Sequence, residues 1–183
     1  MILWTDIRGA VILAAYFAAI VVVAEAWARV GQPKPEWTRK LVHIGGGLGC
    51  LLFPYLIVSP WVVLVMAAGL SLVFLAGAKA NALKSLHCVE RSSRGSEYYP
   101  LAIFIVFVLA YGEPWRYLSA VLVLMVADAF AALIGSRYGR VRFEIEEECK
   151  SLEGSLVFLV IAFLAIHLPL LLLTGLPRPV CVM

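Results

Sequence analysis

The chain has 183 residues, of which 63% are hydrophobic and 15% are charged, and its mean hydropathy is +0.95. This composition excludes a soluble globular protein, because several apolar runs are each long enough to cross about 30 Å of hydrocarbon as a helix. The four cysteines form no Cys-x-x-Cys pair and have no histidine at ligand spacing, so neither a zinc site nor a disulfide framework is supported, and the net charge of +3 says little by itself.

Six apolar spans follow one another along the chain, and each is predicted to be a membrane helix. They are Gly9–Ala28, Leu41–Val58, Trp61–Ala78, Tyr98–Tyr111, Tyr117–Ile134 and Ser155–Thr174. The fourth is short for a full crossing, so we expect its helix to start within the preceding loop or to lie partly in the interface. The expected fold class is all-α: one membrane-embedded domain, residues 1–183, built as a bundle of about six transmembrane helices.

Basic residues gather in three loops, which follow spans one, three and five. These loops hold 12 of the 15 basic residues: Arg29, Lys34, Arg39, Lys40, Lys79, Lys84, Arg91, Arg94, Arg137, Arg140, Arg142 and Lys150. Because loops rich in Lys and Arg stay in the cytoplasm, both chain termini are predicted to lie outside. A cleaved signal peptide is the alternative for the first span. Asp6 and Arg8 cancel where a signal peptide is positive, so a retained helix is expected.

The second span opens with a cluster of cations. Thr38 is predicted to cap the helix and Pro35 to keep the preceding segment out of it, so that Arg39, Lys40 and His43 fall in the first turns near one face. Cations at a helix N-terminus oppose the helix dipole, and they make sense there if a phosphate binds between them. The alternative, at about even weight, is that Arg39 and Lys40 only enforce topology and that His43 is an interfacial core residue.

Asp128 stands inside the apolar run of the fifth span, where it is expected to be buried among helices. A charged side chain at the bilayer centre costs about 2.5–3.5 kcal/mol even on insertion scales, so it indicates a site. Ala132 and Gly135 share its face and permit close helix approach. One interpretation is a carboxylate that holds Mg²⁺; the other is an interhelical hydrogen bond.

The sixth span is preceded by Lys150-Ser-Leu-Glu-Gly154. Ser151 is predicted to cap the helix, Lys150 brings charge to its start, and Glu153 offers a second carboxylate. Gly154 would let a ligand or a neighbouring helix come near. The alternative for Glu153 is an ordinary acid in a first helical turn. Residues 137–150 are expected to form a loop of mixed charge, with a solvated acidic run at 144–148.

A third basic segment precedes the fourth span. Arg91 and Arg94, with the backbone amides around Gly95, are predicted to hold phosphate oxygens in a nest. An ordinary basic interfacial loop is an equally good interpretation by itself. The phosphate interpretation is favoured because all the candidates fall on the same predicted cytoplasmic face, where nucleotides are.

Four stretches in this order resemble the polyprenol kinase family, which includes dolichol kinase, phytol kinase and CTP-dependent diacylglycerol kinase. They are Arg39-Lys-x-x-His43-x-x-x-Gly47, Arg91…Gly95-Ser-x-x-Tyr-Pro100, Asp128-Ala-x-Ala-x-x-x-Gly135-x-x-x-Gly139 and Lys150-Ser-x-Glu-Gly154. The set looks closest to the phytol kinase and bacterial branch. Two departures stand out: Ala127 replaces a Gly of many relatives, and relatives continue past the last motif for further spans, so a C-terminally shortened domain is expected.

The resemblance implies CTP-dependent phosphorylation of a membrane lipid alcohol (phytol, a polyprenol or diacylglycerol) on Mg²⁺. Asp128 and Glu153 would hold the metal, and His43 would orient phosphate or accept the alcohol proton. The nucleotide phosphates would be held by Arg39, Lys40, Arg91, Arg94, Gly95, Gly135, Lys150, Ser151 and Gly154. The expected location is a prokaryotic inner membrane with the site on the cytoplasmic face; no nucleic-acid partner is expected, and homo-oligomerisation stays open.

Two other functions remain as alternatives. A phosphatidate cytidylyltransferase would use the same nucleotide and metal but attack the α-phosphate. A small transporter subunit would place its charged site near the midplane and would often show inverted repeats. The candidate charges here line one interface and no repeat is visible, so the transporter ranks lowest.

Overall fold

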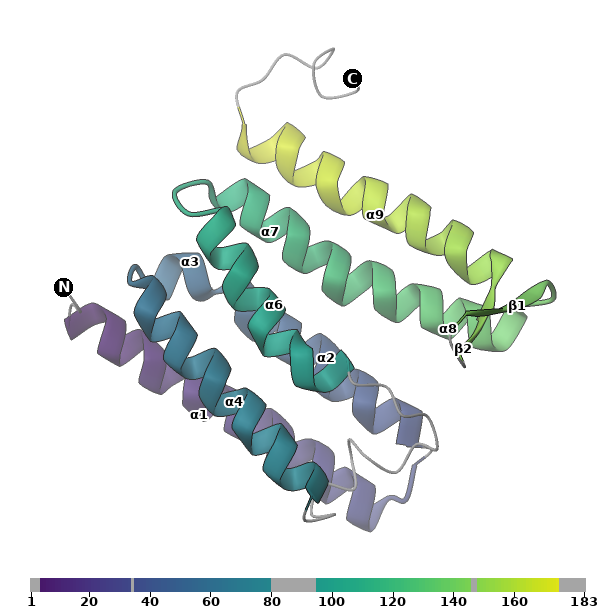
Figure 1. Cartoon of the computed structure of the whole chain (residues 1–183), viewed down its shortest axis with the longest axis horizontal. Coiled ribbons are helices and arrows are strands. Elements are labelled where there is room, and N and C mark those ends of the chain that lie inside the picture. Colours follow the sequence, from purple (N-terminus) through teal and green to yellow (C-terminus); the bar gives the residue numbers. More distant parts are fainter. Residues whose placement is uncertain (1–3, 34, 80–94, 146–147, 175–183) are drawn as a thin grey trace. The chain divides into compact units, whose positions relative to one another are not determined.

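The computed structural model describes residues 4–33, 35–79, 95–145 and 148–174. They are helical apart from short connections and one small hairpin, which confirms the predicted all-α class (Figure 1). The chain divides into two compact units, one up to Tyr111 and the other from Gly112 onward.

The first unit contains α1 (Trp4–Val30), α2 (Pro35–Leu51), the short α3 (Phe53–Leu56), α4 (Pro60–Lys79) and α6 (Gly95–Leu109). α1 packs against α2, and α4 packs against α6, each pair running antiparallel (Figure 1). Phe53 links them: its ring makes edge contacts with Phe17 of α1 at 6.1 Å and with Phe107 of α6 at 6.5 Å between ring centroids. Aromatic pairs of this geometry add to the stability gained by burial alone.

Asp6, near the start of α1, connects this helix to the turn between α3 and α4. Its side chain is buried, and Oδ1 accepts hydrogen bonds from the backbone N–H groups of Val58 at 2.7 Å and Ser59 at 3.4 Å. Close by, a Cβ on Gly9 would lie 2.3 Å from the Leu56 carbonyl oxygen, so only glycine fits. The carboxylate therefore satisfies two donors in the turn between α3 and α4 and holds that turn against α1.

The second predicted span differs from the structure at both ends. The helix does not continue to Val58: α2 ends at Leu51 and α3 follows as a separate turn, because Pro54 has no N–H to continue the α2 hydrogen-bond ladder. The predicted cap at Thr38 is also wrong. α2 begins at Pro35, a residue whose fixed φ suits the first helical position, and Thr38 lies buried inside the first turn.

The second unit is one long helix followed by a hairpin and a second long helix. α7 (Pro114–Leu122), the π-helical η1 (Val123–Ala127) and α8 (Asp128–Tyr138) run on without a break. Strands β1 (Arg142–Ile145) and β2 (Glu148–Ser151) lead into α9 (Leu152–Leu173), which returns antiparallel along α7, η1 and α8 (Figure 1).

The hairpin corrects the prediction of a loop between the last two spans. β1 and β2 pair antiparallel, with Arg142 opposite Ser151, Phe143 opposite Lys150 and Glu144 opposite Cys149. The reason is visible in Val-Arg-Phe-Glu-Ile at 141–145, where apolar and charged residues alternate with the period of two that a strand requires.

Three described helices are long and apolar enough to cross a membrane: Trp4–Val30, Pro114–Tyr138 and Leu152–Leu173. Two shorter apolar stretches lie at Pro60–Val73 and Tyr98–Leu109. α6 begins at Gly95, which confirms that the fourth span starts within the preceding loop. α9 exposes large apolar side chains around its surface, as expected of a helix in lipid. Six crossings and outside termini stay predictions.

Candidate active site

The predicted site residues divide between the two units. Arg39, Lys40 and His43 lie on α2 and Gly95 begins α6 in the first unit, while Asp128, Gly135, Lys150, Ser151, Glu153 and Gly154 lie in the second. Arg91 and Arg94 lie outside the described residues. The four motifs therefore do not all fall within one compact unit of the chain.

In the first unit, α2 and α6 bring two of the motifs together. The His43 ring lies edge-on to the Tyr99 ring, with 5.2 Å between centroids. Lys40 is only 8% exposed, which is unusual for a lysine and indicates an ammonium group held inside the protein. Because α2 starts at Pro35, Arg39 and Lys40 fall in its second turn, one turn further in than expected. The contact with Tyr99 was not predicted, although Tyr99 belongs to the second motif.

In the second unit, the start of α9 packs tightly against the end of α8. Ser151 caps α9 as predicted: its Oγ accepts a hydrogen bond from the Gly154 N–H at 3.2 Å. A Cβ on Gly154 would lie 2.9 Å from the Ala131 carbonyl oxygen, and one on Gly135 would lie 2.8 Å from Ser151 Oγ. Both glycines therefore permit close helix approach, as predicted. We call this packed junction of α8, the hairpin and α9 the corner.

Glu153 connects the first turn of α9 to the residues just before β1. Its Oε1 accepts hydrogen bonds from the backbone N–H groups of Arg140 at 2.9 Å and Val141 at 3.3 Å. Its Oε2 atom is buried and has no hydrogen-bond partner among the described residues. One carboxylate oxygen thus accepts from the backbone, while within the described part of the chain the other is not engaged by a protein donor.

Asp128 differs from the expectation of a buried carboxylate. Its side chain is exposed at the surface of the chain. Asp128 nevertheless lies about 15 Å along the helix from Tyr138, where α8 ends. It directly follows the π-helical turn, and its N–H donates to the Val123 carbonyl. Single π-helical turns inside α-helices occur frequently at functional sites, because the extra residue changes the direction of the side chains that follow. The sequence Val-Leu-Met-Val-Ala contains no signal that predicts this turn.

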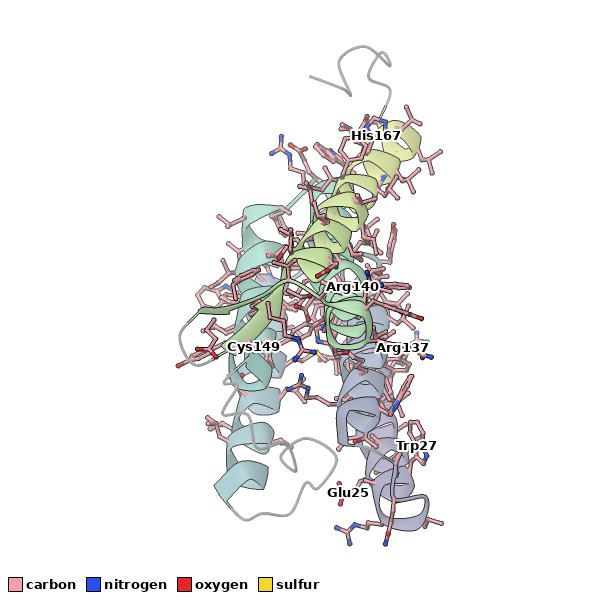
Figure 2. The ribbon with its side chains drawn as sticks, turned by 90° about the vertical axis from the view of Figure 1, so that its right-hand side faces the viewer. Glu25, Trp27, Arg137, Arg140, Cys149 and His167 are labelled. Carbon is pink, nitrogen blue, oxygen red and sulfur yellow. The ribbon has the colours of Figure 1, made fainter. Side chains whose placement is uncertain are left out.

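The Lys150 side chain lies on the face of the hairpin opposite to the Ser151 side chain. Successive strand residues point to opposite faces, so Lys150 shares a face with Phe143, while Ser151 faces α8. Figure 2 shows Cys149 on the hairpin, and Arg137 and Arg140 where α8 ends. Lys150 and Ser151 therefore do not present their side chains to the same point, although they are adjacent in the sequence.

Within the described part of the chain, no group of three or more His, Cys, Asp or Glu residues could hold a metal ion. This does not conflict with a magnesium site of the expected kind, because Mg²⁺ is commonly bound by one or two carboxylates and completes its shell with substrate phosphates and waters.

No family model matches the chain, and no solved structure does. A curated protein named phytol kinase, from Synechocystis sp., is 35% identical over 156 residues, which cover 82% of this chain. The chain belongs to the polyprenol and phytol kinase family. This confirms the resemblance drawn from the four motifs. The matched stretch covers 66% of the Synechocystis phytol kinase, so the chain spans just under two thirds of that relative's length.

Proposed function

We propose that this chain is a membrane lipid kinase that transfers the γ-phosphoryl group of CTP to the hydroxyl of a lipid alcohol. The observation that carries the proposal is the 35% identity to a phytol kinase over 82% of the chain. Phytol is therefore the first acceptor to test, followed by polyprenols and diacylglycerol. The long apolar helices provide the membrane setting that such an acceptor needs.

Phosphoryl transfer depends mainly on positioning and on neutralising the charge of the phosphates. In the second unit, the buried Oε2 of Glu153 is an acceptor with no donor among the described residues, as a ligand of a hard cation would be. Asp128 lies one helical turn before Ala131, whose carbonyl oxygen lies close to Gly154 at the start of α9, and Glu153 is the neighbour of Gly154 in the chain. Asp128 and Glu153 would hold Mg²⁺, which supplies charge neutralisation at the phosphates when bound.

The basic residues would bind the triphosphate. Lys40 and Lys150 would each contact phosphate oxygens, with Arg39 beside Lys40 on α2. Arg91, Arg94 and the amides at the start of α6, from Gly95 on, would assist, while Gly135, Ser151 and Gly154 would shape the corner next to the phosphates. His43 would orient a phosphate or accept the proton of the acceptor hydroxyl.

The acceptor would approach sideways from the bilayer, with its hydroxyl at the cytoplasmic interface where the basic loops lie. The expected setting is the inner membrane of a prokaryote. The proposal includes a homo-oligomer, which is tested by measuring activity against the mass of the reconstituted particle.

The test distinguishes which phosphorus is attacked. Purified protein in lipid nanodiscs is given CTP labelled at the γ or the α position, with phytol, a polyprenol, diacylglycerol or phosphatidic acid. A kinase puts γ-label on one of the alcohols and releases CDP. Label that reaches lipid only from the α position, with phosphatidic acid as acceptor, would transfer the assignment to a cytidylyltransferase. γ-Labelled ATP in a parallel arm tests the choice of nucleotide.

A further inference from the structure

The segment between α8 and β1 is held against the first turn of α9. Residues 140 and 141, which join α8 to β1, are bound to the first turn of α9 by three hydrogen bonds. Two come from the N–H groups of Arg140 and Val141 to Glu153 Oε1, and the third runs from the Leu152 N–H to the Val141 carbonyl at 2.9 Å. The hairpin is thus closed at its base by residues of α9.

Glu153 is suited to this closure by its charge and its length. Two N–H donors converge on one of its oxygens, and hydrogen bonds to an ionised acceptor are about twice as strong as those between neutral groups. An aspartate would be shorter by one methylene and would not reach the same two donors from the first turn of α9. The carboxylate therefore does more than favour the helix dipole.

The closure has a consequence for Lys150. β1 starts directly after the two bound residues, and its Phe143 lies opposite Lys150 on β2. β2 ends at Ser151, which caps α9. The position of Lys150 is therefore fixed from both sides: through β1 by Glu153, and through β2 by the cap. Without the bonds to Glu153, the described bonds that remain on the β1 side of the hairpin are the Leu152–Val141 bond, a long bond from Arg142 Nε to the Gly139 carbonyl, and the pairing itself.

We infer that Glu153 is a positioning residue: through Oε1 it anchors the base of the β1–β2 hairpin and so sets where Lys150 presents its ammonium group. The inference rests on the proposed function only where Lys150 is said to meet a nucleotide phosphate. Glu153 would then have two separable functions: Oε1 anchors the hairpin, and Oε2 would bind the proposed cation.

The native cysteine Cys149 can carry a spin label whose mobility tests the anchor without any assay of activity. Cys149 is an exposed cysteine on β2, next to Lys150, whereas Cys50 is buried. With Cys88 and Cys181 changed to serine, a nitroxide spin label is placed on Cys149, and its mobility is read from the electron paramagnetic resonance spectrum. Glu153→Gln keeps an oxygen for the two N–H groups, so its spectrum should match that of the parent. Glu153→Ala removes the acceptor and should add a mobile component.

The matched control is Glu25→Ala, which removes a carboxylate that accepts from Arg29 on α1 and does not touch the hairpin. It should leave the label unchanged. If the label in the Glu153→Ala protein is as immobile as in the parent, with both samples monodisperse, the anchor does not exist. If Glu153→Gln is as mobile as Glu153→Ala, the carboxamide oxygen does not replace Oε1 and the two tasks of Glu153 are not separable, which overturns the inference.

Kinetics then test the connection to Lys150. Glu153→Gln should lower kcat by removing a cation ligand and leave the nucleotide KM within about twofold. Glu153→Ala should in addition raise that KM about tenfold, since hydrogen bonds between charged groups contribute on that scale. Equal KM values for the two variants would overturn the link to Lys150. An inactive parent protein would count against the proposed kinase, while the spin-label result would still decide the anchor.

Discussion

Substitution of Gly139 by alanine tests how closely α8 and β2 pack at the corner, because its only expected effect is a steric clash of the added methyl group. The Gly139 φ of −65° and ψ of 111° are open to any residue, so alanine brings no torsional strain. Its Cβ, however, would lie 2.3 Å from the Gly135 carbonyl oxygen and 2.5 Å from Ser151 Cβ. Both neighbours are close to the backbone and cannot rotate away, so α8 and β2 must separate.

Overpacking of this kind costs about 1–3 kcal/mol. For a chain of this size, each kcal/mol lowers the unfolding temperature by about 2–4 °C, so Gly139→Ala should unfold about 2–12 °C lower. The matched control is Gly69→Ala inside α4, where a Cβ would meet nothing within 4 Å. There alanine should stabilise by about 0.5–1 kcal/mol through helix propensity. Unfolding of the detergent-solubilised protein is followed by tryptophan fluorescence.

A second substitution locates the clash. Ser151→Gly removes the side chain that Gly139→Ala would strike, and glycine at an N-cap costs only a few tenths of a kcal/mol. The double variant should therefore lose less stability than the sum of the two single changes, with a residual loss from the contact with the Gly135 oxygen. If Gly139→Ala unfolds at or above the parent temperature, α8 and β2 are not packed closely enough to exclude a methyl group.

Three further substitutions test two aspartates, one exposed and one buried. Asp128→Asn should abolish phosphoryl transfer while shifting stability by less than about 0.5 kcal/mol, because the side chain is exposed; normal turnover at saturating Mg²⁺ would exclude a metal role. Asp6→Ala should lose about 1.5–3 kcal/mol of stability, because the N–H groups of Val58 and Ser59 lose a charged acceptor, and Asp6→Asn should lose less. Equal unfolding temperatures for Asp6→Ala and the parent would show that this carboxylate does not hold the turn.

The helical fold could be predicted because the signal for a membrane helix is a long apolar run, which depends on composition more than on contacts. The wrong predictions concern local structure, namely the start of α2 and the loop in place of the hairpin. The sequence prediction puts the helix cap at Thr38, although proline is favoured at the first helical position, where the structure has Pro35. The alternation at 141–145 is typical of a strand, but the charges around it favour a solvated loop and so hide the hairpin.

The candidate site was harder to predict because its geometry depends on contacts between distant residues. The apolar neighbours of Asp128 predict a buried carboxylate, yet the side chain is exposed and follows a π-helical turn that no local pattern indicates. Among the described residues the buried aspartate is Asp6, close to the start of the chain. Its partners at Val58 and Ser59 are too far away in the sequence for spacing to suggest them.

In the Lys150-Ser-Leu-Glu-Gly154 motif, some residues build the local structure and others are candidates for binding the nucleotide. Ser151 caps α9, Glu153 Oε1 holds the start of the hairpin, and Gly154 admits the Ala131 carbonyl, so these groups are already engaged in building the corner. An N-terminus whose Gly154 N–H is capped by Ser151 has fewer free donors for a phosphate. In the proposed kinase, phosphate binding at this motif would therefore depend on the exposed Lys150 and on the proposed cation at Glu153 Oε2, more than on the helix dipole. Salt should accordingly weaken nucleotide binding there, because exposed charges are screened at high ionic strength.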